Sequence, residues 1–142
     1  MVDGLTPERR SWLMSRVRGK NTKPELIVRR LVHALGLRFR LHRGDLPGRP
    51  DLVLPRHKLA IFVHGCFWHR HPDCRLASTP KTRTEFWEAK FDSNVARDAR
   101  NEAALRDLGW QTFTVWECET RNLEALEGKL RKMKRDLAGG VE

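Results

Sequence analysis

The stretch LPGRPDLVLPRHKLAIFVHG, residues 46–65, contains two short apolar runs on either side of the turn sequence PRHK. The runs are Leu52–Leu54 and Leu59–His64. Runs of this length, rich in leucine, valine and isoleucine and separated by a proline-containing turn, predict the two strands of a β-hairpin. We therefore expect the fold to be built around this hairpin.

Helix signals flank the hairpin on both sides. Thr6 and Thr22 are each a candidate cap shortly before a proline, and Gly36 and Gly109 are candidate helix terminators. The expected elements are helices over 6–17 and 22–36, a strand over 37–43, the hairpin, a long amphipathic helix over 82–109, a strand over 111–119 and a helix over 122–136. This order predicts an α/β fold with a central mixed β-sheet flanked by α-helices.

The chain has 142 residues, which suits one domain over 1–142. It has no apolar run long enough to span a membrane and no signal peptide, so we expect a cytoplasmic protein without a membrane partner. The formal net charge of +10 favours nucleic acid as the partner, although basic charge alone is weak evidence.

Three cysteines and a histidine form a candidate metal site. Cys66, His71, Cys74 and Cys118 carry the sulfur and nitrogen ligands that structural zinc prefers, and four protein ligands leave no open position for catalysis. Zinc would join the end of the hairpin to the later strand. The alternative is that the cysteines are small buried hydrophobes and the histidine is a surface residue.

A carboxylate and two histidines lie at the ends of the hairpin strands. Asp51 begins one strand, His64 ends the next and His69 follows shortly after. This arrangement is typical of a magnesium-assisted phosphodiesterase, in which the carboxylate binds the cation and a histidine deprotonates the attacking water. Asp51 could instead cap the turn after Pro50.

The long helix provides a candidate partner for His69. A single face of this helix carries Trp87, Phe91, Asn94, Asp98, Glu102 and Leu105. The apolar members should turn this face inward, so that Asp98 can hydrogen-bond one ring nitrogen of His69 and fix its tautomer. A salt bridge from Asp98 to an arginine is the alternative, and Glu25 could simply complement the dipole of its helix.

The motifs LPGRPDLV, FVHGCFWHRHPDC and TRTEFWEAKFDSNVARDARNEAALRDLGWQTFTVWECE resemble the very short patch repair (Vsr) endonucleases over roughly residues 6–130. This resemblance implies a restriction-endonuclease-like fold, a structural zinc and Mg²⁺-dependent nicking of double-stranded DNA. The family cuts 5′ to the thymine of T:G mismatches that arise when 5-methylcytosine deaminates. It also implies a bacterial, nucleoid-associated monomer, with repair proteins as further partners.

The resemblance implies a role for each matching residue. Asp51 becomes the essential magnesium ligand, His69 the general base and Asp98 its partner, while His64 and Glu25 are active-site residues of undecided role. The zinc ligands are Cys66, His71, Cys74 and Cys118. The residues implied to wedge beside the mismatch are the aromatic Phe67, Trp68 and Trp87. Core packing remains the alternative for Trp87.

Further contacts with DNA are expected from the N-terminal helix and nearby basic residues. Residues 1–20 are expected to form a DNA-clamping helix, and residues 21–138 the catalytic core. The candidate DNA-binding residues, in addition to the aromatic wedge, are Met14, Val17, Arg16, Arg18, Lys20, Lys23 and Arg49.

The chain departs from the family pattern at three places. Val63 stands where many members have threonine, so only its main-chain carbonyl could bind magnesium. The zinc loop has one extra residue before its second cysteine, which leaves Asp73 as a competitor of Cys74. No E-x-K follows Asp51, which favours a histidine base.

Two other functions stay open: a restriction-like or mobile-element nuclease with another target, and a zinc-bearing DNA-binding module without catalysis. A binding module would not require Asp51, His69 and Asp98 together. The bases flanking the mismatch, the associated methyltransferase and the number of magnesium ions do not follow from the sequence.

Overall fold

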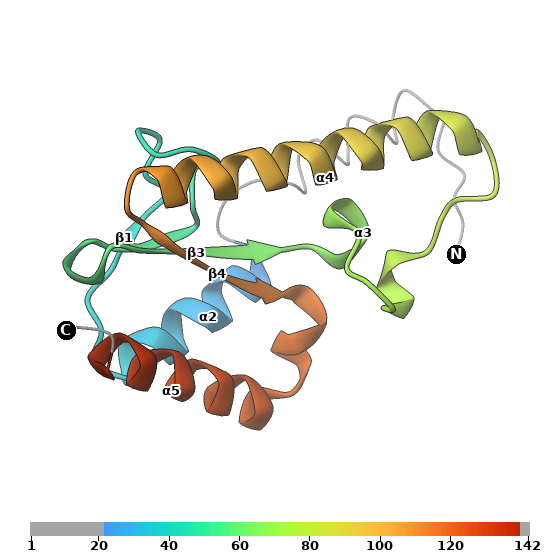
Figure 1. Ribbon diagram of the computed structural model, residues 1–142. Helices are drawn as coiled ribbons and strands as arrows, with labels where there is room; N and C mark the ends of the chain where they lie inside the picture. The colour runs from blue at the N-terminus through green and yellow to red at the C-terminus, as the bar shows by residue number, and fades with distance from the viewer. Residues whose placement is uncertain (1–21, 140–142) are drawn as a thin grey trace.

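The computed structural model describes residues 22–139 (Figure 1). The helices are α2 (Lys23–Ala34), α3 (Cys66–His69), α4 (Thr84–Asp107) and α5 (Leu123–Gly139), and short 3-10 helices are η1 (Pro55–His57), η2 (Arg75–Ala77) and η3 (Glu117–Arg121). The strands are β1 (Arg40–Leu41), β2 (Leu52–Leu54), β3 (Leu59–His64) and β4 (Gln111–Trp116). The helix expected over 6–17, with Met14, Arg16, Val17, Arg18 and Lys20, lies outside the described residues.

The four strands form one mixed sheet in the order β1-β2-β3-β4. β1 and β3 each pair with β2 in antiparallel orientation, and β4 pairs with β3 in parallel orientation. The hairpin prediction is confirmed, with the same bounds for both strands. Because β3 and β4 are parallel, the chain crosses from one to the other through α3 and α4.

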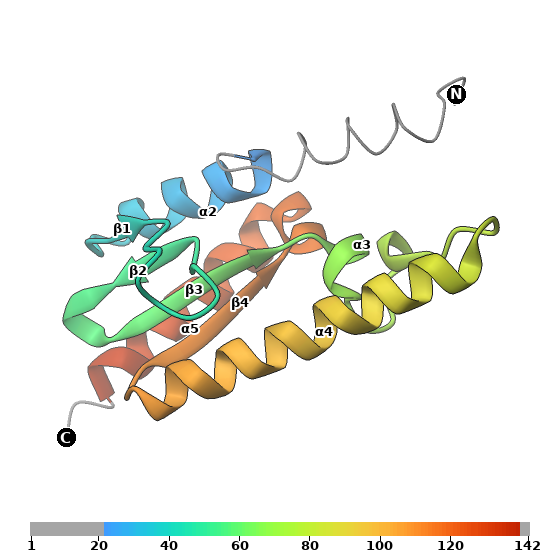
Figure 2. The same cartoon turned by 90° about the horizontal axis from the view of Figure 1, so that it is seen from above.

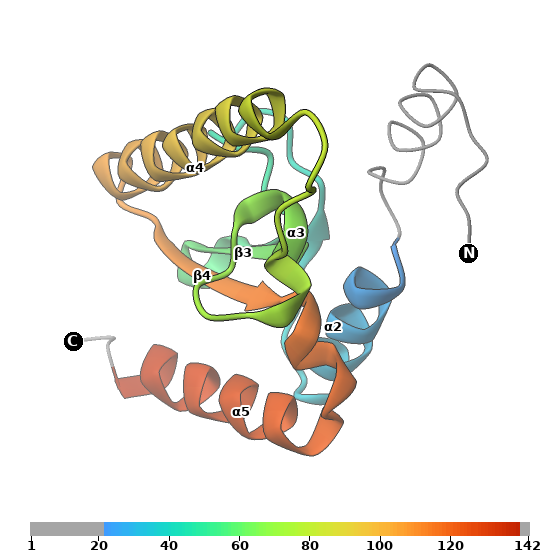
Figure 3. The same cartoon turned by 90° about the vertical axis from the view of Figure 1, so that its right-hand side faces the viewer.

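Helices cover the sheet in two layers. α4 lies over one face, and α2 and α5 lie over the other, as both side views show (Figures 1 and 3). This arrangement confirms the predicted α/β fold with a central mixed sheet flanked by helices.

The core divides along the two faces because strand side chains alternate. Leu52, Leu54 and Ile61 belong to a cluster with residues of α2 and α5, whereas Val53 and Phe62 belong to a second cluster that includes Leu105 of α4. The middle strands are therefore apolar except for His64 at the end of β3, as expected for strands that are covered on both faces.

The helix signals predicted at Thr22, Gly36 and Gly109 are confirmed, whereas Thr6 lies outside the described residues. The Thr22 hydroxyl accepts a hydrogen bond from the Glu25 N–H at the start of α2. Gly36 and Gly109 follow the ends of α2 and α4 with φ of 80° and 88°, the left-handed conformation that glycine adopts without strain.

Two strand predictions were too long. The strand expected over 37–43 is only Arg40–Leu41, because pairing with β2 stops where His42 takes a φ of 49°. The strand expected over 111–119 ends at Trp116, and the following residues form η3. There the Glu119 carboxylate accepts the Trp116 N–H at 2.7 Å, which closes a helical turn in place of an extended chain.

Among the helices of residues 22–139, none combines the length and apolar character needed to cross a lipid bilayer.

Candidate functional site

Asp51 lies at the end of the sheet where β3 finishes. It directly precedes β2, whose first residue Leu52 pairs with Ile61, so the chain before β2 lies along the last residues of the antiparallel β3. The Val63 N–H donates a hydrogen bond of 2.6 Å to Asp51 Oδ2, so the carboxylate lies one residue from His64. The structure thus brings Asp51 and His64 to one place.

The environment of Asp51 opposes ionisation. Burial raises the pKa of this carboxyl to about 6, and the nearby negative charge of Glu25 adds to the effect. The Val63 hydrogen bond and the proximity of His42 and His69 lower the pKa, but by less. A bound cation would stabilise the ionised form of this carboxyl, and an ionised carboxylate is the form that binds Mg²⁺.

Two histidines stack on each other at the end of β3, and the charge of one of them, His69, acts on Asp51. The rings of His64 and His69 lie 3.9 Å apart between centroids with 6° between their planes. Burial and the charge of His69 lower the pKa of His64 to about 4. His64 is therefore neutral at physiological pH.

His69 is hydrogen-bonded to Asp98. Its Nδ1 lies 2.6 Å from Asp98 Oδ2, across the contact between α3 and α4. Burial disfavours the charged form of Asp98, but the hydrogen bond and the charge of His69 outweigh it, so the pKa of Asp98 is lowered. Figure 2 shows α3 at the end of β3, beside the first half of α4.

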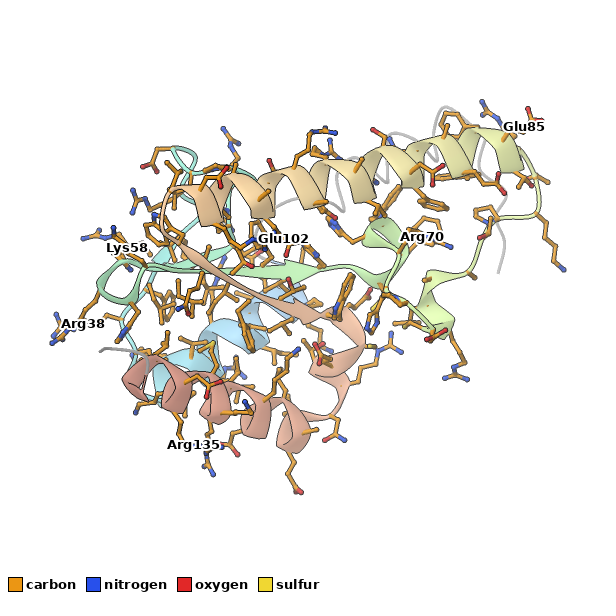
Figure 4. All side chains as sticks on the ribbon, viewed as in Figure 1. Arg38, Lys58, Arg70, Glu85, Glu102 and Arg135 are labelled. Atoms are coloured by element: carbon orange, nitrogen blue, oxygen red, sulfur yellow. The ribbon has the colours of Figure 1, made fainter. Side chains whose placement is uncertain are left out.

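The inward face predicted for α4 is confirmed. Phe91, Asn94 and Leu105 are buried, and Asp98 is only partly exposed. Asn94 adds a contact that the sequence did not suggest, because its side-chain amide donates to the Trp68 carbonyl at 3.2 Å. Arg70, labelled below α4 in Figure 4, stacks over the Phe91 ring at 4.0 Å. α3 is therefore anchored on α4 by several side chains.

Glu25 and His42 complete the surroundings of Asp51. Glu25 is 3% exposed, and its carboxylate lies 2.5 Å from His42 Nε2 and accepts a second hydrogen bond from Arg29. Ligand atoms of Glu25, His42 and Asp51 all lie within 4.8 Å of one another. Sequence reasoning did not include His42, and the only signal for it was its position at the end of an alternating segment.

The four candidate zinc ligands converge beyond the ends of β3 and β4. His64 of β3 pairs with Trp116 of β4, so Cys66 and Cys118 each follow the last paired residue by two positions. His71 and Cys74 complete a set whose ligand atoms all lie within 4.8 Å of one another. The exposed Asp73, left open as an alternative to Cys74, does not belong to this set.

The dimensions of this set fit zinc. His71 Nδ1 lies 3.6 Å from Cys66 Sγ and 3.5 Å from Cys118 Sγ. In a tetrahedral zinc site, a sulfur and a nitrogen ligand are about 3.5 Å apart. Burial raises the pKa of the Cys66 thiol to about 12, so a bound cation is what would hold this buried group as a thiolate.

Trp116 connects the two sites, although no motif or spacing in the sequence selected it. Its ring stacks on His71 with centroids 4.3 Å apart, and the ring edge contacts His64 at 5.4 Å. Trp116 therefore packs between a candidate zinc ligand and the stacked histidines.

The three candidate wedge residues form an aromatic cluster with Phe91. Ring centroids are 5.0 Å apart for Phe67 and Trp68, 5.9 Å for Trp68 and Trp87, and 5.1 Å for Phe67 and Phe91. Phe67, Trp68 and Trp87 keep partial exposure while Phe91 is buried, so the cluster has an accessible side. Among the other candidate DNA contacts, Lys23 and Arg49 are exposed.

Comparisons with known proteins agree on the kind of protein. Residues 2–76, more than half of the chain, match the family model described as DNA mismatch endonuclease Vsr. The chain is 55% identical to the type II nicking enzyme V.XorIIP of Xanthomonas oryzae pv. oryzae, over 94% of this chain and 97% of that protein. It is 43% identical to the DNA mismatch endonuclease Vsr of Escherichia coli, over 89% and 80% respectively.

A third relative, the type II nicking enzyme V.NmeAIP of Neisseria meningitidis, is 37% identical over 99% of this chain and all of that protein. Together with these relatives, the fold and its clustered acidic and histidine side chains define a DNA endonuclease. The chain belongs to the family of the DNA mismatch endonuclease Vsr.

Proposed function

We propose that this protein nicks one strand of double-stranded DNA on the 5′ side of the thymine in a T:G mismatch, with Mg²⁺ as the catalytic ion. Such mismatches arise when 5-methylcytosine deaminates, and the nick would start very short patch repair. The observation that carries the proposal is that Asp51 is hydrogen-bonded next to the end of β3, where His64 stacks on His69 and Asp98 is hydrogen-bonded to His69.

In this proposal His69 is the general base. Its Nδ1 is occupied by Asp98, which leaves Nε2 to take a proton from the attacking water. The charge of Asp98 stabilises the imidazolium that forms, and the neutral His64 adds no positive charge against it. His64 stacked on His69 would also restrict the rotation of the base.

Asp51 is the proposed magnesium ligand, with the Val63 main-chain carbonyl as a second ligand and Glu25 close by. A bound Mg²⁺ would polarise the phosphodiester and stabilise the charge that develops on its oxygens. Zinc at the four-ligand set would have a structural role, holding α3 and therefore His69 in place.

The aromatic cluster is the proposed mismatch reader. Inserting Phe67, Trp68 and Trp87 beside a base pair requires unstacking, which costs a few kcal/mol and less at a weakened pair. The cluster surrounds the segment that carries His69, so reading and cutting would occur side by side. The proposed fold relationship to restriction endonucleases agrees with a mixed sheet whose end carries the acidic residue.

Nicking of defined duplexes tests the proposed specificity. Duplexes with a T:G, T:A or C:G pair at one position and randomised flanks are incubated with Mg²⁺, each strand labelled separately. We expect cutting 5′ to the mismatched thymine only, at least about 30-fold faster than at T:A, which corresponds to about 2 kcal/mol of avoided unstacking. Equal nicking of T:A and T:G duplexes would instead indicate a sequence-specific nicking enzyme.

Removal of the proposed base tests the catalytic assignment. His69→Ala is expected to lower the nicking rate about 10²- to 10⁴-fold, the usual contribution of a general base, with DNA affinity retained. Asp98→Asn should lower the rate about 10- to 100-fold, since a hydrogen bond to a charged partner contributes about 1.5–3 kcal/mol. Single-turnover kinetics and a gel-shift assay separate the two effects.

The exposed His33 of α2 offers a matched control, because His33→Ala removes an imidazole far in sequence from the proposed base. Its nicking rate should equal that of the wild type. Wild-type nicking by His69→Ala would exclude His69 as the base.

A further inference from the structure

His42 has an unusual backbone conformation next to Asp51. It follows the two-residue strand β1 and has a φ of 49°, in the left-handed region where histidine is one of the more tolerated residues. Its N–H still donates to the Asp51 carbonyl at 3.2 Å, so the two residues face each other across the strand pair. The local backbone therefore ties His42 to Asp51 while ending the strand.

The side chain of His42 reaches Glu25, which lies seventeen residues earlier. His42 Nε2 is 2.5 Å from Glu25 Oε2, and Arg29 donates to the same oxygen from the next turn of α2. The side chains of Glu25 and His42 are 5% and 16% exposed. A carboxylate with so little access to water depends on such partners for both its charge and its orientation.

Glu25 in turn lies beside the proposed cation ligand. Glu25, His42 and Asp51 place ligand atoms within 4.8 Å of one another. Glu25 lies on α2, His42 follows β1 and Asp51 precedes β2. Two carboxylates this close repel, as the effect of Glu25 on the Asp51 carboxyl shows, and His42 acts in the opposite direction. His42 thus contacts the Glu25 carboxylate through its side chain and Asp51 through its backbone.

We infer that His42 is a positioning residue for the divalent-cation site. Its Nε2 hydrogen bond orients the Glu25 carboxylate toward a cation bound by Asp51. The inference rests on the proposed function, which assigns the cation to Asp51. A merely structural role, in which His42 satisfies a buried acid, would leave ion affinity unchanged when stability is retained.

The effect of losing this hydrogen bond follows from the second partner of Glu25. Without His42, the partner that remains to the carboxylate among the described residues is Arg29, which lies one turn further along the same helix. Partners that orient metal ligands in this way typically contribute 10- to 100-fold in metal affinity. We expect a loss in this range, although His42 itself need not touch the ion.

The test measures Mn²⁺ binding to the zinc-loaded full chain by the loss of the free-ion electron paramagnetic resonance signal. Asp51→Asn identifies the site: the Mn²⁺ that the wild type binds and this variant does not is the ion bound at Asp51. His42→Phe keeps a ring but removes the donor, and His42→Asn keeps a polar group too short to reach. His42→Gln places an amide nitrogen where Nε2 lies. Melting curves accompany each variant.

His42→Phe and His42→Asn should bind Mn²⁺ at the Asp51 site at least about tenfold more weakly than the wild type, and His42→Gln should recover most of the affinity. His42→Asn provides the comparison if His42→Phe does not fold. Wild-type affinity in His42→Asn, or a His42→Gln variant as weak as His42→Asn, would overturn the inference.

A nicking assay on the same proteins separates this inference from the proposed function. If the wild type binds Mn²⁺ through Asp51 with the expected His42 dependence but does not nick T:G duplexes, the inference stands and the proposed function fails. If Asp51→Asn binds as much Mn²⁺ as the wild type, no cation site exists at Asp51 and the inference is overturned, whatever the nicking result.

Discussion

Cys66→Ser is expected to lower the free energy of unfolding by at least about 3 kcal/mol and to abolish nicking. Structural zinc sites have binding free energies on the order of 10 kcal/mol, and these become folding free energy because the unfolded chain has no such site. Cys66 is fully buried at the first residue of α3, so a weakened site would also leave a polar hydroxyl without its metal partner.

The region near the zinc set has side-chain contacts with α4 but no buried core of its own. Between residues 67 and 90 no side chain is buried, and α3 has only four residues, far fewer than an isolated helix needs. This same region carries His69 and the three aromatic residues of the proposed wedge. Loss of the metal should therefore disorder the proposed base and the proposed wedge together, while the hairpin core remains.

Urea unfolding with a zinc stoichiometry measurement checks this expectation. Asp73→Asn is the matched control: it changes an exposed acid next to Cys74, and asparagine also tolerates the φ of 56° at this position. The control should keep one zinc per chain and lie within about 0.5 kcal/mol of the wild type. Full zinc content and unchanged stability in Cys66→Ser would contradict the structural role.

Asp51→Asn is expected to abolish nicking and, at the same time, to stabilise the ion-free protein. The carboxylate is the proposed cation ligand, and losing several kcal/mol of transition-state stabilisation lowers the rate about 10³-fold or more. The amide oxygen of asparagine can still accept the Val63 N–H, so the local backbone contact survives. DNA binding should be retained.

The stability gain depends on pH in a definite direction. The Asp51 pKa is about 6 in the folded state against an ordinary 3.8, so between these values the folded state binds more protons than the unfolded state. The contribution of Asp51 to stability therefore decreases as pH rises through this window. The Asp51→Asn variant avoids this decrease. Its free energy of unfolding should exceed that of the wild type by about 3 kcal/mol at pH 7.5 and by roughly half as much at pH 5.

Urea unfolding of the two zinc-loaded proteins at both pH values, with and without Mg²⁺, measures this advantage. Mg²⁺ should stabilise the wild type at pH 7.5 and leave Asp51→Asn unchanged, because the variant lacks the carboxylate that is the principal proposed ligand. An Asp51→Asn variant less stable than the wild type at pH 7.5 would show that the ionised carboxylate is well accommodated, and that the site is not poised for a cation.

The sequence alone was sufficient for the features that depend on near neighbours. The hairpin strands, the cap at Thr22 and the helix ends at Gly36 and Gly109 follow from residue preferences within a few positions. The inward face of α4 follows from helical periodicity, and the cysteine and histidine types indicate a metal set whatever the fold. The strand ends and the helix face suggested the roles of Asp51, His69 and Asp98, and the family motifs gave the same assignments, which remain predictions.

Contacts between distant segments were decided only by the tertiary structure. His42 meets Glu25 and Asp51 because it follows β1 in a left-handed conformation beside the start of β2, and no local pattern encodes that juxtaposition. Trp116 reaches His64 and His71 through the parallel register of β3 and β4. Register and strand ends depend on the packing of the whole sheet, since a short strand gains its stability from its partners and not from its own residues.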